Sequence, residues 1–328
     1  MTQHTNSTFT TLADLASARV GGRAIATNDD FFASRANLIK AEPAIFIPGK
    51  YTSRGKWMDG WESRRRRTPG HDWCIVKLGM RGIVRGVDVD TSFFTGNFPS
   101  HCSIDALDTT RLLKPADYTA GGAPWTPLLP KTALRGDSQN LLAVVHDKPC
   151  THLRLNIFPD GGVARLRAYG EVVVDWARVA PKGRVVDLAA IQHGGLVLTA
   201  SDVHYGAKDN MIMPGRAANM ADGWETKRRR GPGYDWAIVR LGAPGVIYKI
   251  EIDTNHFKGN FPDSASLEGQ TADGSWSEIL PQTKLRAHHR HVFAKELRTV
   301  PAVSQVRLNI YPDGGVSRLR VYGTLAAR

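Results

Sequence analysis

Hydrophobic and polar residues alternate with a period of two over many short stretches of this chain. Within the segment from Ile83 to Asp90, two valines alternate with two aspartates, which is typical of a strand with one buried and one solvated face. Helical periodicity is confined to a short stretch from Ala13 to Arg19. The pattern therefore predicts an all-β chain of half-buried strands rather than an α/β sheet.

A second alternating run, Leu153 to Ile157, precedes the turn sequence Pro159 to Gly162, and alternation resumes from Arg165 to Ala168. Two such runs joined by Pro, Asp and Gly predict a β-hairpin. Long polar side chains along these runs and their counterparts would form a sheet face that pairs with carboxylates. They are Arg154, Asn156, Arg165, Arg167, Arg307, Asn309, Arg318 and Arg320.

The chain contains one module written twice. Asp59 to Pro99 aligns without a gap with Asp222 to Pro262, and 23 of 41 positions are identical, against roughly 6 to 7 per cent expected by chance. Arg154 to Gly170 matches Arg307 to Gly323 at 14 of 17 positions. Between these blocks, and again before Asp59, the first copy carries about ten extra residues, a length typical of surface loops.

With 328 residues, the chain is long enough for two domains, each with its own core. We expect a first repeat at residues 1–176 and a second at 177–328, with a linker near 176–182. The expected fold is two tandem antiparallel β-sandwiches of the jelly-roll type.

Composition places the chain among soluble globular proteins. No stretch approaches the ~18 apolar residues of a membrane span, and the start lacks a basic segment followed by an apolar one. The net charge of +12 fits an anionic small substrate or nucleic acid. Because neither a membrane span nor a leader segment is indicated, we expect a cytoplasmic protein without a membrane partner. The basic run lacks a zinc site or an RNA-binding aromatic signature, so we expect no nucleic-acid partner, and nucleic-acid binding is a minor alternative.

The three cysteines are expected to be packed in the core. Cys74 aligns with Ala237, Cys102 with Ala265 and Cys150 with Val303. A nucleophile or a metal ligand requires the thiolate, which alanine and valine lack. His288, His289 and His291 occur in one copy and have no carboxylate or cysteine partners at ligand spacing, so an exposed basic loop is favoured over a metal site.

Polar residues kept in both copies lie in two segments. The first begins with Asp59-Gly60-Trp61-Glu62, continues through a basic run, Arg64 to Arg67, and ends with His71-Asp72-Trp73. The second spans Asp90 to Pro99. Both lie at strand ends, where a sandwich presents its binding loops. The residues alone leave two interpretations: carboxylates and arginines that neutralise one another, or a site for an anionic, amide-bearing ligand.

Three stretches resemble the allantoicase family: Gly49 to Arg64, Asp72 to Gly79, and Asp90 to Pro99. The resemblance covers nearly the whole chain. It implies two galactose-binding-like jelly-roll repeats, in agreement with the duplication. The second copy departs from the first, because it lacks the Gly49 to Trp57 insertion and has Tyr234 in place of His71.

The resemblance implies hydrolysis of allantoate to ureidoglycolate and urea, with the new oxygen on the central carbon. We expect Glu62 or Asp59 to act as general acid for the departing urea and Asp72 or Asp90 to position water, with His71 as an alternative base. The first copy is expected to supply these groups. No metal is required by this route, and dependence on a divalent metal is left open.

Substrate binding is assigned to cationic, hydroxyl and amide side chains and to one carboxylate of the second copy. Arginine offers paired donors to the substrate carboxylate, and an asparagine amide can bind a ureido group. The candidates are Arg65, Arg66, Arg67, Thr91, Asn97, Glu225 and Asn260. We expect a homo-oligomer. The competing interpretation is a noncatalytic ureide- or carbohydrate-binding sandwich, because a fold does not establish activity.

Overall fold

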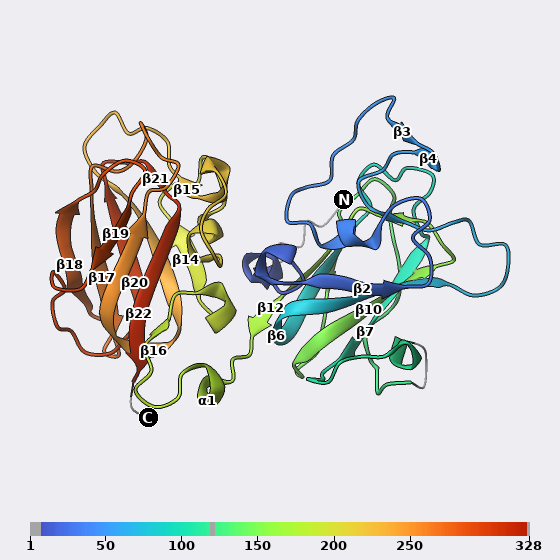
Figure 1. Ribbon diagram of the computed structural model, residues 1–328, viewed down its shortest axis with the longest axis horizontal. Coiled ribbons are helices and arrows are strands. Elements are labelled where there is room, and N and C mark those ends of the chain that lie inside the picture. The colour runs from blue at the N-terminus through green and yellow to red at the C-terminus, as the bar shows by residue number, and fades with distance from the viewer. Residues whose placement is uncertain (1–7, 119–121, 327–328) are drawn as a thin grey trace, which may run out of the picture. The chain divides into compact units, whose positions relative to one another are not determined.

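The computed structural model describes residues 8–118 and 122–326. The chain divides into two compact units, Met1–Val173 and Val174–Arg328 (Figure 1). The short helix α1, Trp176–Val179, lies at the start of the second unit. Each unit repeats the same order of strands, so the duplication seen in the sequence is a duplication of structure.

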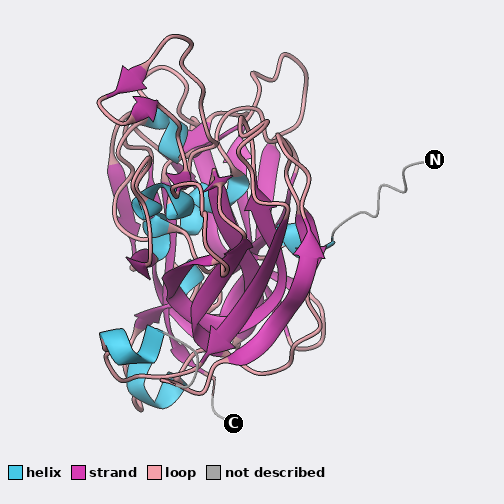
Figure 2. Cartoon of the chain, turned by 90° about the vertical axis from the view of Figure 1, so that its right-hand side faces the viewer, coloured by secondary structure: helices cyan, strands magenta, loops and turns pink. Residues whose placement is uncertain are grey.

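Strands and connecting loops dominate both units, and every helix is short (Figure 2). The elements of the first unit are η1 Thr8–Thr11, β1 Ala13–Asp14, η2 Ala18–Val20, β2 Arg23–Thr27, η3 Arg35–Ile39, β3 Tyr51–Thr52, β4 Gly55–Lys56, β5 Trp61–Glu62, β6 Asp72–Asp90, β7 His101–Leu107, η4 Pro115–Tyr118, β8 Thr126–Ala133, β9 Leu141–Ala143, β10 Cys150–Phe158, β11 Gly162–Val163 and β12 Arg165–Val172. Those of the second unit, after α1, are β13 Val186–Asp187, η5 Ile191–His193, β14 Leu196–Ala200, η6 Lys208–Ile212, η7 Met220–Asp222, β15 Trp224–Glu225, β16 Asp235–Asp253, β17 Ser264–Thr271, β18 Trp276–Lys284, β19 Arg290–Phe293, β20 Val303–Tyr311, β21 Gly315–Val316 and β22 Arg318–Leu325.

Strand β6 organises the first unit because its two halves pair with different strands. Residues 72–77 pair with β2 and β10, and residues 82–90 pair with β9 and β12, all antiparallel. The pairing order β1-β12-β6-β10-β7-β8 recurs in the second unit as β13-β22-β16-β20-β17-β18. The predicted fold, two tandem all-β antiparallel sandwich repeats, is confirmed.

The predicted hairpin between Leu153 to Ile157 and Arg165 to Ala168 is wrong. Both runs are strands, but β10 and β12 pair with opposite halves of β6 and not with each other. The turn between them therefore carries the chain from one set of strands to the other. Glycine and proline identify such a turn from the sequence, but they do not reveal the partner of each strand.

Two further expectations need correction. The stretch expected to be helical holds strand β1 and a single 3₁₀ turn, η2. The stretch from Ile83 to Asp90 is expected to have one solvated face. Its two aspartates, Asp88 and Asp90, are instead both buried. The aromatic ring of Phe9 covers the strand at Gly86, because a Cβ atom on Gly86 would lie 2.4 Å from that ring.

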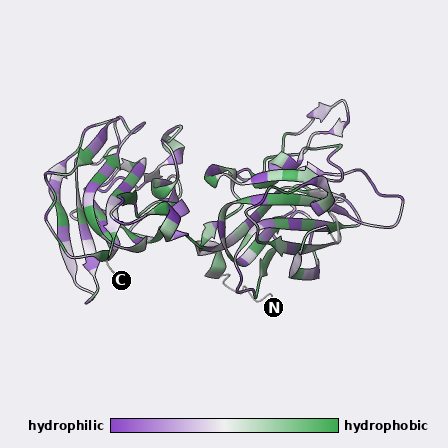
Figure 3. Cartoon of the chain, turned by 60° about the horizontal axis from the view of Figure 1, so that its bottom comes forward, coloured by the Kyte–Doolittle hydropathy of each residue, from purple (hydrophilic) through white to green (hydrophobic). Residues whose placement is uncertain are grey.

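Alternating strands supply the core of each unit, as the bands of hydrophobic and hydrophilic residues along them show (Figure 3). All three cysteines are buried and free, so their predicted packing role is confirmed. The predicted pairing of the long polar side chains with carboxylates is also confirmed. The ion pairs are Arg154–Asp105, Arg165–Asp59, Arg167–Asp14, Arg307–Glu268, Arg318–Asp222 and Arg320–Asp187.

Candidate functional site

A carboxylate from strand β5 and an amide from the loop between β6 and β7 meet in the first unit. Nδ2 of Asn97 donates a 2.7 Å hydrogen bond to Oε1 of Glu62. Together they line a cavity of about 310 Å³, with Phe32, Gly55, Lys56, Met58, Phe93, Thr95 and Gly96. The structure thus brings together two of the residues that the sequence analysis assigned to the site, one as an acid and one as a ureido-binding group.

The backbone around Glu62 fixes its side chain at this cavity. Trp61 is fully buried, and its indole Nε1 donates a 2.8 Å hydrogen bond to the carbonyl of Asp29. Successive side chains of a strand point to opposite faces, so Glu62 turns away from the core. Asn97 is fixed as well, because its carbonyl accepts a 2.7 Å hydrogen bond from the Gly162 amide.

Burial raises the pKa of Glu62 above its ordinary value. The hydrogen bond from Asn97 and the charge of Lys56 act in the opposite direction, but they do not cancel the effect of burial. A carboxyl group that holds its proton to higher pH is better suited to donate that proton to a leaving group.

Lys56 is a cavity residue that the sequence analysis did not single out. It belongs to the β3–β4 hairpin, which lies within the extra segment of the first copy. Its Nζ lies 4.6 Å from the centre of the Phe46 ring, and that ring stacks on Phe93 with centroids 5.9 Å apart. Among the described residues its ammonium group has no ion-pair partner, so the cavity offers a positive charge to an anionic ligand.

Asp59 lies outside this cavity, in a buried ion-pair network. Its carboxylate accepts hydrogen bonds from Nη2 of Arg165 at 2.6 Å, from Nζ of Lys40 at 2.8 Å and from the backbone amide of Ile45 at 3.2 Å. Burial alone would raise the pKa of Asp59, but the bonds from Lys40 and Arg165 outweigh it and hold the pKa below the ordinary value. This carboxylate anchors the segment that leads into the hairpin.

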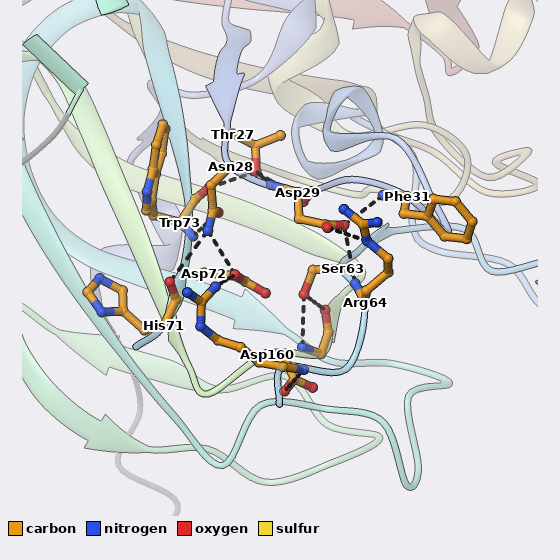
Figure 4. A network of polar contacts seen from close by, with 12 residues as sticks. Thr27, Asn28, Asp29, Phe31, Ser63, Arg64, His71, Asp72, Trp73 and Asp160 are labelled. Carbon is orange, nitrogen blue, oxygen red and sulfur yellow. Dashed lines mark hydrogen bonds and ion pairs between the residues drawn. The ribbon is translucent and has the colours of Figure 1, made fainter. Parts of the chain in front are cut away.

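The basic run is tied to carboxylates of the same unit (Figure 4). Nη1 of Arg66 lies 2.7 Å from the carboxylate of Asp72, and Nε of Arg64 lies 2.7 Å from that of Asp29. Asp160, in the turn after β10, accepts a 2.8 Å hydrogen bond from the Arg66 amide. Arg65 and Arg67 are exposed, and none of the three predicted arginines lines the Glu62 cavity.

The remaining candidates also support loops. Asp90 accepts a 2.8 Å hydrogen bond from the Ser92 amide, and Thr91 Oγ1 donates a 2.6 Å bond to the Arg135 carbonyl. The ring of His71 packs against Phe158 with centroids 4.7 Å apart, and burial lowers its pKa. In Figure 4 this ring lies outside the polar network around Asp72.

The second unit repeats the carboxylate–amide pair. Nδ2 of Asn260 donates a hydrogen bond to Oε1 of Glu225. The pair lines a cavity of about 390 Å³ that also includes Arg228 and Arg229. The segment between Ala217 and Asp222 has four residues, where the first copy has fourteen between Ala44 and Asp59. A counterpart of the hairpin that carries Lys56 is therefore missing.

Within residues 8–118 and 122–326, no group of three or more His, Cys, Asp or Glu side chains is arranged to hold a metal ion. Over the same residues, no helix has both the length and the apolar character needed to cross a lipid bilayer.

Comparison with known proteins places both units in one family. The family model described as the allantoicase repeat matches residues 13–173 and 186–326. A protein named probable allantoicase 1 from Burkholderia mallei is 48% identical over 328 residues, covering 95% of this chain and 94% of the relative. A probable allantoicase from Ralstonia nicotianae is 49% identical over 323 residues, covering 95% and 94%. The crystal structure of allantoicase from Saccharomyces cerevisiae superposes with a TM-score of 0.83 at 33% identity, covering 98% of each chain.

Proposed function

Because this chain belongs to the allantoicase family, we propose that it hydrolyses allantoate to ureidoglycolate and urea in purine degradation, at the Glu62 cavity of the first unit. The observation that carries this location is that one cavity is lined by three polar groups: a carboxyl group with a raised pKa, an amide, and an ammonium group that forms no ion pair within residues 8–118 and 122–326. Allantoate carries one carboxylate and two ureido groups, so its polar parts are complementary to these three side chains.

Formation of ureidoglycolate requires cleavage of a bond between the central carbon and a ureido nitrogen. The protonated Glu62 donates its proton to the nitrogen of the departing urea, and the lone pair of the remaining ureido nitrogen forms a C=N bond to the central carbon. Water then adds to that carbon, and the Glu62 carboxylate takes the proton that the water releases. The carboxyl group of Glu62 is thereby restored, and the overall reaction converts allantoate and water to ureidoglycolate and urea.

Asn97 and Lys56 have separate roles in this scheme. The bond from Asn97 Nδ2 holds Glu62 in place and leaves the Asn97 Oδ1 atom to accept a ureido N–H. The Lys56 ammonium binds the substrate carboxylate, a role that the sequence analysis gave to Arg65, Arg66 and Arg67. A fixed orientation of the ureido group relative to the acid contributes to the rate by positioning.

The other predicted acids support these groups from outside the cavity. Asp59 anchors the segment before the hairpin, Asp72 anchors the basic run, and Asp90 with Thr91 anchors the loop that carries Asn97. We assign to them, and to His71, the positioning of loops rather than proton transfer.

The test is an assay of the purified chain with allantoate, followed by urea release and by the glyoxylate obtained from ureidoglycolate. Glu62→Gln keeps the size of the side chain and removes its proton, so it should lower kcat by about 100- to 10,000-fold. Glu225→Gln is the matched control in the second unit and should keep the rate within about twofold. Equal losses in both variants would contradict a single active unit, and allantoate binding without turnover by the unsubstituted chain would favour a noncatalytic ureide-binding protein.

Two broader expectations accompany this proposal. We propose that the enzyme acts in the cytoplasm, where the free thiols of its three cysteines are stable. We also propose a homo-oligomer, as is common among metabolic enzymes. Sedimentation equilibrium of the purified chain tests the second expectation, and a monomer at micromolar concentration would contradict it.

A further inference from the structure

The cavity of the second unit lies on a different side of its carboxylate–amide pair than the cavity of the first. The first cavity extends from Glu62 towards the hairpin. The second is bounded instead by Arg228 and Arg229, in the basic run at residues 227–230 of the second unit, and by the turn at residues 312–314. The two units thus keep the same central pair but surround it with different charges.

The polar groups of the second cavity match a ureido group. Asn260 donates one of its amide hydrogens to Oε1 of Glu225, which leaves Glu225 Oε2 and Asn260 Oδ1 as acceptors. A ureido group presents several N–H donors in one plane, and two neighbouring acceptors can bind them. Glu225 is 8% exposed, so a hydrogen bond to its carboxylate would be shielded from water.

The cationic groups of this cavity differ in whether they are already engaged. The Arg229 side chain pairs with Asp235, and its backbone amide donates a 2.8 Å hydrogen bond to Asp313. Arg228 is exposed, lines the cavity and has no hydrogen-bond or ion-pair partner among the described residues. Its guanidinium can therefore bind a ligand carboxylate through two parallel hydrogen bonds without breaking an existing contact.

This cavity lacks the features that the proposed reaction uses in the first unit. The four residues between Ala217 and Asp222 leave no room for a hairpin that would bring an ammonium group to Glu225. The second cavity thus retains groups for recognition without the full set of groups assigned to cleavage.

We propose that the second unit carries a separate, noncatalytic binding site for small ureides that bear a carboxylate, with Glu225 and Asn260 binding the ureido group and Arg228 binding the carboxylate. The choice of ligand rests on the proposed function, but the existence of the site does not. Allantoate binds there without being hydrolysed.

Titration calorimetry of the full-length Glu62→Gln chain with allantoate tests this site. Two binding events per chain are expected. Adding Arg228→Ala should weaken one of them by about 10- to 100-fold, the effect of losing a hydrogen bond to a charged group, and should leave the other unchanged. Arg230→Ala, an exposed arginine of the same run outside the cavity, is the matched control and should change neither event.

Further variants assign the two events to their units. Lys56→Gln in the Glu62→Gln chain should weaken the binding event that Arg228→Ala leaves unchanged. Urea lacks a carboxylate, so Arg228→Ala should not change the affinity of the chain for urea. A single binding event, or two events that both ignore Arg228→Ala, would overturn the proposal. If the unsubstituted chain does not turn over allantoate, the same titration on that chain still counts its sites, so failure of the proposed activity and failure of the second site are distinguished.

Discussion

Arg66 and Asp72 form an ion pair in which Nη1 lies 2.7 Å from Oδ1 and the carboxylate side chain is 3% exposed. Removal of one partner leaves a buried charge with fewer hydrogen bonds. Arg66→Ala should therefore lower the free energy of unfolding by about 1 to 3 kcal/mol, as measured by urea denaturation. Arg65→Ala, at an exposed neighbour, should change it by less than about 0.5 kcal/mol. An increase in KM without loss of stability would instead support the substrate-binding role inferred from the sequence.

Lys56 supplies the positive charge of the first cavity. If its ammonium binds the substrate carboxylate, Lys56→Gln should raise KM for allantoate by about 10- to 100-fold, because a hydrogen bond between charged groups is lost. The same hairpin provides the control in Lys50, whose Nζ lies 4.0 Å from the centre of the Trp57 ring outside the cavity. Lys50→Gln should leave KM within about twofold, and equal effects of both substitutions would argue against a specific role for Lys56.

Asp59 provides a test of structural against catalytic function. It is the partner of Arg165, whose side chain is 1% exposed. Asp59→Asn should cost about 3 to 5 kcal/mol of stability, because the guanidinium loses its countercharge. The equivalent Asp222→Asn in the second unit should cost less, since the Asp222 side chain is 19% exposed. A chain that stays equally stable but loses kcat in Asp59→Asn would restore Asp59 to the reaction.

Asp88 makes the stability of the first unit depend on pH. Burial and the neighbouring Asp90 raise the pKa of Asp88 to about 7, and its buried Oδ1 atom has no hydrogen-bond partner in the described part of the chain. The folded chain thus keeps a proton that the unfolded chain releases above about pH 4. Its contribution to stability is fully present below pH 4 and falls by up to about 1.4 kcal/mol per pH unit as pH rises to 7. Urea denaturation at pH 5, 6, 7 and 8 should show that Asp88→Asn removes this contribution.

The second unit offers a matched control for Asp88. Its equivalent, Glu251, pairs with Arg290 at 2.7 Å, and the strand register places Gln139 at the position of Arg290. Gln139→Arg should therefore supply a countercharge and reduce the same pH dependence. If neither Asp88→Asn nor Gln139→Arg changes the slope of stability against pH, the protonation of Asp88 is not its source.

The cysteines should be unreactive in the folded chain. Burial raises the pKa of Cys102 and of Cys150 to about 12 and that of Cys74 further, so few thiolates exist at pH 8. Iodoacetamide should modify none of the three until the chain is unfolded, as followed by mass spectrometry. Cys74→Ala should retain activity, since the second unit has alanine at the equivalent position. Rapid labelling of a native cysteine would show that its segment opens locally.

The period-two pattern and the duplication were sufficient to predict the class of fold. The pattern reports which side chains are buried along each strand, and the duplication reports that one module occurs twice. The pairing of strands was not predictable in the same way. β10 and β12 are joined by the short segment 159–164, which includes β11, but they pair with different halves of β6. That arrangement depends on contacts distant in sequence.

Comparison of the two copies identified Glu62 and Asn97 because the same residue types stand at the equivalent positions Glu225 and Asn260. The structure then shows that each carboxylate accepts a hydrogen bond from the amide of its own unit. The same comparison passed over Lys56, since it belongs to a segment that the second copy lacks. It also selected Asp59, because a buried ion pair is retained in both copies as strictly as a catalytic acid would be. Only the position of each carboxylate relative to the cavity distinguishes these cases.

The pairing of β1 with β12 joins the first strand of the unit to its last, and this has a consequence for the order of folding during synthesis. When β6 has been made, three of its four partner strands, β9, β10 and β12, still lie ahead in the chain. Contacts so distant in sequence form slowly, since the loops between them must close first. The first unit therefore cannot close until residues 165–172 have left the ribosome, and until then the exposed edges of β6 are open to misassembly.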